Sequence, residues 1–573
     1  MLNSRDTIWH IKDDLPSAVW LAGEVGISKL LASLLIQRNV SSPDSAQSFL
    51  SPRLGSLRDP FLLKDMDRAV ELIANFIVEK RRITIYGDYD ADGLTATSLL
   101  VGFFSKLGTP ISFYIPHRLE EGYSLNEKAV RQIAAANTGL IITVDCGINA
   151  LSEIALAKRL GMEVIVTDHH KIPPDFEPIC PTIDPLRPDS LFPFQELSGV
   201  GLAFYLAIAI RSHLREAGFF KDTCEPDLRS CLDLVALGTV ADIVPLTEEN
   251  RIMVKSGLNV LMDSQRPGIK ALLGVSGIRK DQIIATDDIS FKLAPRLNAM
   301  GRLGSATRAV HLLTTDNETE ASLIADQMDS LNAQRQVIEN RIVSETRERI
   351  ERMEDIEARR TIVLFDPRWH RGVVGIVASK IVEEYYRPTL ILALEGDLLR
   401  GSGRSIDGFD LHQALSDLSD LLRQFGGHGH AAGVSLETQS IGEFSHKFEE
   451  LARKRIDPKD MIPKIEVDAK LSLESIDPQT LKEIEMLVPF GHGNPQPIFW
   501  AGPLKVISSR VVGKDHLKLK LKEKGITFDC IAFGKAASHP LEGKSVDILF
   551  HLGTNTWQGI ESIQLVVVDL RLN

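Results

Sequence analysis

The sequence lacks several features that mark particular classes of protein. It has only five cysteines, an odd number without a Cys-x-x-Cys pair, which argues against a disulfide framework and a zinc ribbon. No stretch approaches the roughly 18 uninterrupted apolar residues that a membrane span needs. The first residues contain no basic segment followed by an apolar run and a cleavage site. We therefore expect a cytoplasmic protein with reduced thiols and no membrane partner.

The chain also has no excess of basic residues. Its 65 Lys and Arg against 77 Asp and Glu give a net charge of -12, the opposite sign from most nucleic-acid-binding surfaces. An acidic chain can still act on nucleic acid, because bound cations offset a cluster of Asp carboxylates while a local basic groove binds the strand. The net negative charge is therefore compatible with a metal-dependent nuclease.

At 573 residues the chain is too long for one hydrophobic core, so we expect several domains. Residues 1–69 are predicted to form a helical lead-in. In residues 70–316, β-rich runs alternate with helical patterns, which predicts a parallel α/β sheet. Residues 317–360 contain neither Pro nor Gly and predict one long connecting helix. A second α/β domain is expected over 361–455, and short strands over 463–573 predict a β-barrel with an OB-fold.

Acidic residues cluster directly after the first expected strand. The segment Gly87-Asp-Tyr-Asp-Ala-Asp-Gly93 contains three aspartates within five positions, namely Asp88, Asp90 and Asp92. Carboxylates so close together repel one another unless cations bind. Taken alone, the segment also fits an Asp-rich turn, a helix cap or a calcium loop.

Two further strands end in the same way. Leu140–Val144 runs into Asp145, and Glu163–Thr167 runs into Asp168-His169-His170. In open α/β sheets the site lies beyond the carboxyl ends of the strands, so we expect these side chains to converge there. Asp242 lies in an otherwise apolar run and requires a metal or hydrogen-bond partners if it is buried. Carboxylates together with imidazoles suit Mn²⁺, Mg²⁺, Fe²⁺ or Zn²⁺, and the excess of carboxylates favours Mn²⁺ and Mg²⁺.

In this order the residues resemble the four motifs of the DHH phosphoesterases, a superfamily named after its Asp-His-His triplet. The resemblance implies two divalent metal ions, Mn²⁺ or Mg²⁺, held by Asp88, Asp90, Asp92, Asp145, His169, His170 and Asp242. All of these except Asp88 are also expected to be catalytic, with Asp145 bridging the ions. Such a pair of ions activates a water for in-line attack on phosphorus. Related pyrophosphatases carry a His at the position of Tyr86, which leaves open which of the three clustered aspartates binds which ion.

Other segments are similar to the RecJ branch of this superfamily. Residues 426–433, Gly-Gly-His-Gly-His-Ala-Ala-Gly, resemble the signature of the DHHA1 domain, in which glycines let backbone amides approach phosphate. The alternative is a tight turn between packed elements. Four segments resemble RecJ exonucleases and extend the likeness over about residues 70–435: 116–125, 293–303, 369–379 and 400–405. A C-terminal OB-fold fits the same layout.

A nuclease that acts at a strand end needs donors that hold the terminal phosphate. The candidate substrate-binding residues are Arg118, Arg302, Gln334, Ser402, Arg404 and His428. The arginine fork matches phosphate geometry, although a structural ion pair is the alternative for each arginine. In the barrel, His516, Lys518, Lys520 and Trp557 have the charge and rings that an OB-fold uses on a single strand, but core packing or a protein contact is the alternative, and no individual barrel ligand is assigned.

The resemblance implies a 5′→3′ exonuclease that hydrolyses single-stranded DNA to mononucleotides in recombination and repair. Single-strand binding protein and a RecQ-type helicase are the partners it implies. The alternatives are a DHH phosphodiesterase for short oligonucleotides or cyclic dinucleotides, a pyrophosphatase, and a non-catalytic DHH scaffold that binds DNA or replication proteins. The barrel and the long helix argue against a small-substrate enzyme, and the retention of every acidic and histidine motif argues against a scaffold.

Overall fold

The computed structural model describes residues 7–118, 120–279, 281–353, 355–557 and 560–573, with the side chains of 556–560 left out. The chain divides into two compact units. One unit comprises the chain up to residue 9 together with 299–304 and 327–465, and the other comprises 10–298, 305–326 and 466–573. The larger unit therefore contains both the first α/β domain and the C-terminal barrel.

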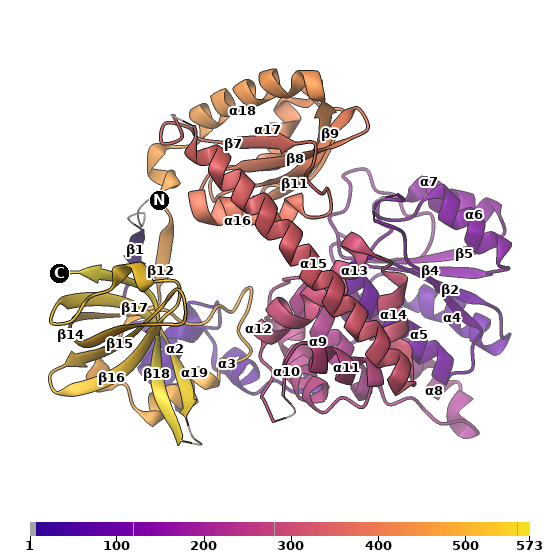
Figure 1. The fold of residues 1–573 in the computed structure, drawn as a ribbon. Helices are drawn as coiled ribbons and strands as arrows, with labels where there is room; N and C mark the ends of the chain where they lie inside the picture. The colour runs from indigo at the N-terminus through magenta and orange to yellow at the C-terminus, as the bar shows by residue number, and fades with distance from the viewer. Residues whose placement is uncertain (1–6, 119, 280, 354, 558–559) are drawn as a thin grey trace. The chain divides into compact units, whose positions relative to one another are not determined.

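A parallel sheet of five strands forms the centre of the first α/β domain (Figure 1). In spatial order its strands are β3 (Ile111–Tyr114), β2 (Ile83–Gly87), β4 (Leu140–Val144), β5 (Glu163–Thr167) and β6 (Thr182–Ile183). β2 and β4 are buried at every position, because helices cover both faces of the sheet. On one face lie α4 (Met66–Val78), α5 (Ala91–Lys106) and α8 (Gly199–Glu216), and on the other α6 (Glu127–Ala135) and α7 (Leu151–Arg159).

After the sheet, residues 232–351 form a series of helices. α9 is buried along most of its length, because its sequence is almost entirely apolar. A short π-helical turn, Ile289–Leu293, separates α12 from α13. The helices are α9 (Leu232–Ala241), α10 (Glu248–Met262), α11 (Pro267–Val275), α12 (Thr286–Asp288), α13 (Ala294–Leu303) and α14 (Thr307–Thr314). The predicted connecting helix is present as α15 (Glu318–Glu351).

The second α/β domain has a mixed sheet in the order β10-β11-β9-β8-β7. Only β7 and β8 are parallel, and the remaining neighbours are antiparallel. Its strands are β7 (Ile362–Asp366), β8 (Thr389–Glu395), β9 (Leu398–Arg404), β10 (Gln424–His428) and β11 (Ala431–Glu437). Its helices are α16 (Val374–Tyr385), α17 (Leu411–Asp417) and α18 (Ile441–Arg455).

The C-terminal strands close into a barrel, because β14 pairs with β17 as well as with β15. The strands are β13 (Ala469–Lys470), β14 (Phe499–Val512), β15 (His516–Glu523), β16 (Ile526–Ala532), β17 (Ser545–Trp557) and β18 (Ile560–Leu572), and α19 (Pro478–Glu485) precedes β14. In β15, apolar residues at alternate positions face the core. The predicted fold class, two α/β domains joined by a long helix and followed by an OB-type barrel, is confirmed.

The N-terminal segment differs from a purely helical lead-in. A strand, β1 (Ile8–Ile11), comes first and pairs with β12 (Lys464–Val467). The helices α1 (Ser17–Val25), α2 (Lys29–Ile36) and α3 (Pro43–Leu50) follow, and their apolar residues share one core with the barrel. Local patterns report helical periodicity but not the partner, so the sequence did not indicate this packing.

The described part of the chain contains no single helix that combines the length and apolar character of a membrane span. Only α1 and α2 taken together meet the length and composition, and they are bent by 113° at their junction.

Candidate metal centre

The sheet aligns four aspartates at its carboxyl edge. Gly87 pairs with Val144, Val144 with Thr167, and Thr167 with Ile183. The next residue in each strand is an aspartate, so the register brings together Asp88, Asp145, Asp168 and Asp184. All four are buried. The first three were predicted from strand ends, whereas Asp184 was missed because β6 has only two residues and gives no readable pattern.

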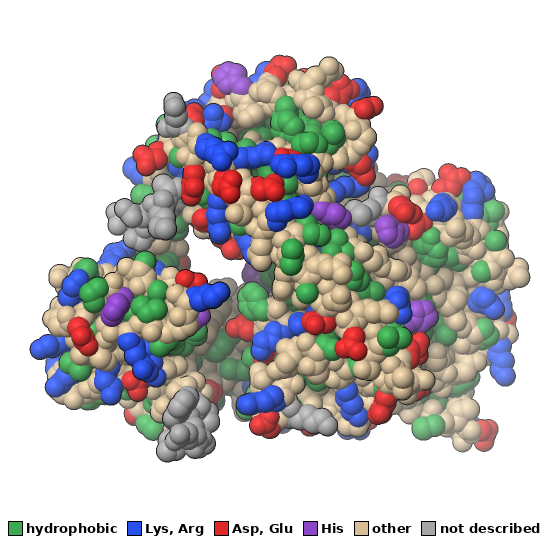
Figure 2. Space-filling model, in the orientation of Figure 1, with side chains coloured by type: hydrophobic (Ala, Val, Ile, Leu, Met, Phe, Trp, Pro, Cys, Tyr) green, Lys and Arg blue, Asp and Glu red, His purple; other side chains and the backbone are tan. Residues whose placement is uncertain are grey.

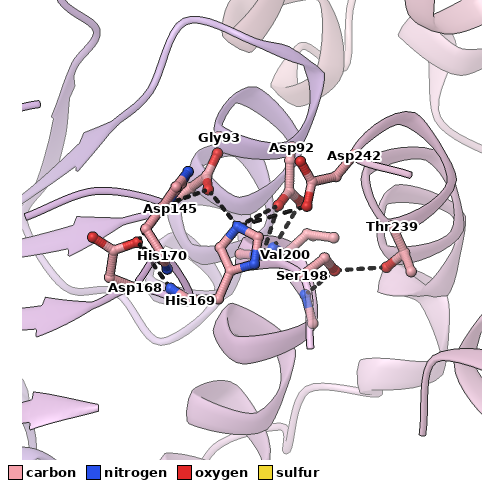
Figure 3. A network of polar contacts seen from close by, with 12 residues as sticks. Asp92, Gly93, Asp145, Asp168, His169, His170, Ser198, Val200, Thr239 and Asp242 are labelled. Atoms are coloured by element: carbon pink, nitrogen blue, oxygen red, sulfur yellow. Dashed lines mark hydrogen bonds and ion pairs between the residues drawn. The ribbon is translucent and has the colours of Figure 1, made fainter. Parts of the chain in front are cut away.

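The imidazole of His169 lies among three carboxylates (Figure 3). Its Nε2 is 3.0 Å from Asp145 Oδ1, 3.6 Å from Asp242 Oδ2 and 3.9 Å from Asp92 Oδ2. Asp242 reaches this place because it is the C-cap residue of α9. Residues that are far apart in the sequence therefore present ligand atoms to one point.

Asp168 orients the histidine pair. Its Oδ1 accepts bonds from the backbone N–H of His169 at 2.8 Å and of His170 at 3.2 Å, and lies 2.7 Å from His170 Nδ1. Its Oδ2 accepts the N–H of Ile148 at 2.9 Å. A carboxylate that holds one ring nitrogen of a histidine fixes the direction of the other, as is common around metal-binding histidines.

Asp90 and Asp92 are fixed by helix N-termini. Asp90 is the N-cap of α5, where its Oδ1 accepts the N–H of Asp92 at 3.0 Å and of Gly93 at 3.2 Å. The two oxygens of Asp92 accept the N–H groups of Gly199 at 2.6 Å and Val200 at 2.9 Å, in the first turn of α8. Helix N-termini favour negative charge, so both carboxylates are held in place without a cationic side chain.

Burial and mutual repulsion raise the pKa of most of these carboxyl groups. Burial raises the pKa of Asp92 to about 7, and the negative charge of Asp90 is the second cause. Burial also raises the pKa of Asp242 to about 9 and holds the pKa of Asp145 well above its ordinary value. For both groups the negative charge of Asp92 is the second cause. Burial likewise holds the pKa of Asp88 well above its ordinary value, and the negative charge of Asp90 is the second cause. Without a cation, the site can keep its aspartates in place only by retaining protons.

The two histidines are pushed in opposite directions. Burial lowers the pKa of His169 to about 4, with the charge of His170 acting in the same sense. Burial opposes protonation of His170 as well, but its bond to Asp168 raises its pKa to about 9. Neutral His169 can therefore offer a lone pair to a metal at physiological pH.

The donor set fits divalent cations. Three groups have ligand atoms within 4.8 Å of one another: Asp88 with Asp90 and Asp145, Asp92 with His169 and Asp242, and Asp145 with His169 and His170. Asp145 and His169 are each common to two groups, and of these two only the carboxylate has two oxygens with which to bridge a pair of ions. Asp88 Oδ1 is buried without a hydrogen-bond partner, and a buried carboxylate oxygen requires one. Mostly oxygen donors with a few imidazoles suit Mn²⁺ and Mg²⁺.

Two tyrosines near the centre have different roles. Tyr86 is completely buried, donates to the carbonyl of Ser124 at 2.8 Å and stacks on Tyr114, so it belongs to the core and not to the ligand set. The hydroxyl of Tyr123 donates to the Asp145 carbonyl at 3.1 Å and lies 3.0 Å from His170 Nδ1. The sequence pattern gave no reason to single out Tyr123.

Three of the predicted substrate-binding residues, Arg302, Ser402 and Arg404, gather at the N-terminus of α16, within the smaller unit. The carbonyl of Gly372, just before the helix, accepts a bond from Arg302 Nη1 at 2.8 Å. A Cβ built on Gly375 would lie 3.3 Å from Ser402 Oγ and 3.5 Å from Arg404 Nη2, so both side chains contact the first turn. Arg404 Nη1 also donates to Ser402 Oγ at 2.7 Å. Burial lowers the pKa of His428, with His430 and Arg404 acting in the same sense.

This cluster has the features of an anion site. The N-cap residue of α16 is Val373, whose apolar side chain cannot accept the N–H groups of the first turn. A helix N-terminus next to arginines binds phosphate through its dipole and its free amides. The sequence alone did not indicate that segments 302, 372–375 and 402–404 meet.

The other predicted substrate-binding residues lie elsewhere. Arg118 stacks over the ring of Tyr89, 4.9 Å from its centroid, and its charge offsets part of the rise that burial causes in the pKa of Asp88, so it belongs to the metal centre's surroundings. Gln334 is exposed on α15, where its Nε2 donates to Ser330 Oγ at 3.4 Å. Figure 2 shows Lys and Arg side chains over the barrel, and Lys520 on β15 is exposed. The side chain of Trp557 lies outside the described residues.

Comparisons with known proteins agree with this architecture. Residues 82–239 match the DHH family, N-terminal domain, residues 359–454 the DHHA1 domain, and residues 467–569 the RecJ OB domain. The single-stranded-DNA-specific exonuclease RecJ of Escherichia coli (strain K12) is 39% identical over 526 residues, covering 89% of this chain and 90% of the relative. The chain belongs to the RecJ family. RecJ of Bacillus subtilis (strain 168) is 37% identical over 569 residues, covering 98% of this chain and 70% of the relative.

Solved RecJ structures share the fold. The crystal structure of RecJ from Thermus thermophilus in complex with Mn²⁺ has a TM-score of 0.83 at 30% identity and covers 99% of this chain and 79% of that chain. The complex with Mg²⁺ has a TM-score of 0.78 at 29% identity and covers 99% and 78%. The resemblance inferred from the motifs is thereby confirmed.

The raised pKa values lead to a prediction for this RecJ chain. Asp92, Asp242 and His170 retain protons near neutral pH, so Mn²⁺ binding should release protons. The affinity should therefore rise with pH from 6 to 9, roughly tenfold per unit for each proton released. Titration calorimetry in two buffers of different ionisation enthalpy measures the number released. An Mn²⁺ affinity that stays constant over this range would contradict the protonated state of the metal-free site.

Proposed function

We propose that the chain is a metal-dependent 5′→3′ exonuclease that hydrolyses single-stranded DNA to mononucleotides. The observation that carries the proposal is the buried cluster around His169, in which carboxylates from three strand or helix ends lie within 4 Å of one imidazole. Such a cluster is costly to fold unless dications neutralise it. Membership of the RecJ family supports the choice of single-stranded DNA as the substrate.

We assign Asp88, Asp90, Asp92, Asp145, His169, His170 and Asp242 to a pair of Mn²⁺ or Mg²⁺ ions, with Asp145 shared between them. When bound, the ions would activate a water and neutralise the charge that develops on the phosphate. The protein supplies the positions of the donors. Asp168 holds His170, the first turn of α8 holds Asp92, and the N-terminus of α5 holds Asp90. A scaffold this firmly fixed lowers the cost of ordering the site when metal and substrate bind.

The cluster at α16 accounts for action at a strand end. We assign Arg302, Ser402, Arg404 and His428, together with the first amides of α16, to the terminal 5′-phosphate. Guanidinium groups bind phosphate through paired, charge-assisted hydrogen bonds. A terminal monophosphate carries more negative charge than an internal diester, so such a site favours an end over the middle of a strand. Arg118 and Gln334 are also assigned to substrate binding.

The cellular role follows from the family. We propose that the enzyme acts in the cytoplasm, in recombination and repair, where single strands with free 5′ ends arise. Single-strand binding protein and a RecQ-type helicase are the proposed partners, because one covers and the other produces the substrate.

The proposal is tested by release of label from the two ends of one strand. We expect a long single-stranded DNA with Mn²⁺ or Mg²⁺ to lose a 5′ label early and a 3′ label late. A blunt duplex of the same sequence should keep both labels. The released product should be a mononucleotide, which chromatography of the early fractions identifies.

Each alternative predicts a different result. A phosphodiesterase for short oligonucleotides or cyclic dinucleotides would cleave a dinucleotide and leave the long strand intact. A scaffold would bind the strand and release neither label with any metal. Early loss of the 3′ label would retain the nuclease but overturn the assigned polarity.

A further inference from the structure

One segment between α19 and the barrel has no role in the site described so far. The sequence Phe490-Gly-His-Gly-Asn494 forms a tight turn in which Gly491 and Asn494 exchange backbone hydrogen bonds of 2.9 and 3.0 Å. We name residues 490–494 the clamp turn. It belongs to the same compact unit as the metal centre.

The clamp turn is fixed to the larger unit at both ends. The carbonyl of Phe490 accepts a bond of 2.7 Å from Thr286 Oγ1. Asn494 is completely buried, and its Oδ1 accepts a bond of 2.7 Å from Arg38 Nε. The Nδ2 of Asn494 donates to the carbonyls of Leu487 at 2.8 Å and Pro489 at 2.7 Å. A buried, fully bonded asparagine holds its turn in one conformation.

A second anchor lies just before the turn. Arg251 of α10 is almost completely buried and lies 3.9 Å from the ring centroid of Phe49. Its guanidinium donates to backbone carbonyls on two segments, at distances of 2.8 to 3.3 Å: Phe49, Met486, Leu487, Val488 and Pro489. A guanidinium fork can bond several carbonyls at once, which a lysine cannot do with the same geometry.

The held turn presses against the loop that carries Asp242. We name residues 242–247, between α9 and α10, the Asp242 loop. The N–H of Leu246 donates to the carbonyl of His492 at 2.7 Å. A Cβ added to Gly493 would lie 2.8 Å from Pro245 Cβ, and one added to Gly491 would lie 2.7 Å from Leu246 Cδ1. The two glycines therefore let the turn approach the loop as closely as backbone can.

The Asp242 loop requires such support because its backbone is strained. Ile243 has a φ of 62°, a left-handed conformation that a β-branched residue strongly disfavours. Its side chain is 69% exposed, so core packing does not compensate for the strain. On the other side, Asn250 Nδ2 donates to the carbonyl of Pro245 at 3.0 Å. The loop is thus held between α10 and the clamp turn.

We propose that the clamp turn is a positioning element of the metal centre, which holds Pro245 and Leu246 so that Asp242 stays beside His169 and Asp92. The inference rests on the proposed function of Asp242 as a metal ligand. It gives the C-terminal module a part in the chemistry in addition to any contact with DNA. Displacing the turn should move Asp242 away from its neighbours and weaken the metal site.

The test uses the whole 573-residue chain with Gly493→Ala. The added Cβ meets Pro245, and the φ of 71° at this position adds strain. We expect Mn²⁺ affinity, measured by calorimetry on the metal-free protein, to fall about tenfold, the range seen when support of a metal ligand is lost. The kcat on a short single-stranded oligonucleotide should fall with it, while KM stays close to that of the wild type.

The matched control is Gly513→Ala. Gly513 has a φ of 62° in the β14–β15 turn of the barrel that follows the clamp turn, where a Cβ would make only an ordinary contact of 3.6 Å with His516. It introduces the same left-handed strain without the close contact, so it should lower Tm and leave Mn²⁺ affinity unchanged. If Gly493→Ala does not fold, Gly491→Ala replaces it, because its φ is not left-handed and its Cβ still meets Leu246 of the Asp242 loop, at 2.7 Å from Cδ1 and 3.2 Å from Cγ.

The outcomes distinguish a failure of the positioning role from a failure of the proposed metal site. Wild-type Mn²⁺ affinity and kcat in the folded glycine variant would overturn the positioning role of the clamp turn. An equal loss of Mn²⁺ affinity in Gly513→Ala would also overturn it, since the effect would then follow from barrel stability. A wild-type chain that binds no Mn²⁺ would overturn the proposed metal site itself.

Discussion

Replacement of Asp145 by Asn is expected to lower the release of 5′ nucleotides by about 1000-fold or more, beyond the 10–100-fold typical of residues that only support metal ligands. Asp145 belongs to two of the three ligand groups and is the proposed shared ligand, so its loss should affect both ions. Asn keeps the size of the side chain but removes the charge. Single-turnover measurements with a labelled single strand at saturating Mn²⁺ check the value.

The same substitution should not destabilise the metal-free protein. The pKa of Asp145 is raised in the folded state, so ionisation of this carboxyl opposes folding. The resulting loss of stability grows as pH rises above the ordinary pKa of an aspartate. The neutral Asn avoids the cost. We therefore expect the metal-free variant to have a Tm at pH 8 equal to or above that of the wild type, and a smaller increase in Tm when Mn²⁺ is added.

An exposed aspartate in the same domain provides the matched control. Asp175→Asn makes the same change of charge at the surface and should leave activity and the Mn²⁺-dependent Tm unchanged. Nucleotide release by Asp145→Asn at the wild-type rate would refute the role of Asp145. A Tm that falls by the same amount with and without Mn²⁺ would point to a folding defect instead.

Removal of the 5′-phosphate from the substrate is expected to lower kcat/KM of the wild type by roughly 10–100-fold, the value of one or two hydrogen bonds to a charged group. Arg404 and Ser402 contact each other and the first turn of α16, so Arg404→Gln should disrupt the phosphate site. This variant should lose a similar factor on the phosphorylated strand. Its kcat/KM should then depend little on whether the phosphate is present.

The comparison is a cycle of two enzymes and two substrates, which isolates the contact between Arg404 and the phosphate. Arg423→Gln is the matched control, because Arg423 is an exposed arginine of the same domain that pairs with Glu437. It should respond to the phosphate as the wild type does. If Arg404→Gln also retains the full dependence on the phosphate, the assignment of the α16 site is wrong.

Much of the metal centre was readable from the sequence because its signals are local. An aspartate directly after an apolar strand is visible in a run such as Leu140–Val144 followed by Asp145. Parallel strands then bring their carboxyl ends to one edge, whatever the rest of the fold. Asp184 has the same position after β6, with its pKa raised to about 8 chiefly by burial, but a two-residue strand carries no pattern.

The sequence by itself determined the fold class, the long helix, the ligand types and the family, because each depends on short-range periodicity or on a motif. Only the tertiary structure decided which distant segments meet. It placed Arg302 beside Gly372 and packed the helices α1, α2 and α3 into the core of the barrel. It also placed the clamp turn against Pro245 and Leu246. Such contacts depend on the packing of complementary surfaces. The sequence of one segment does not indicate which distant segment it will contact.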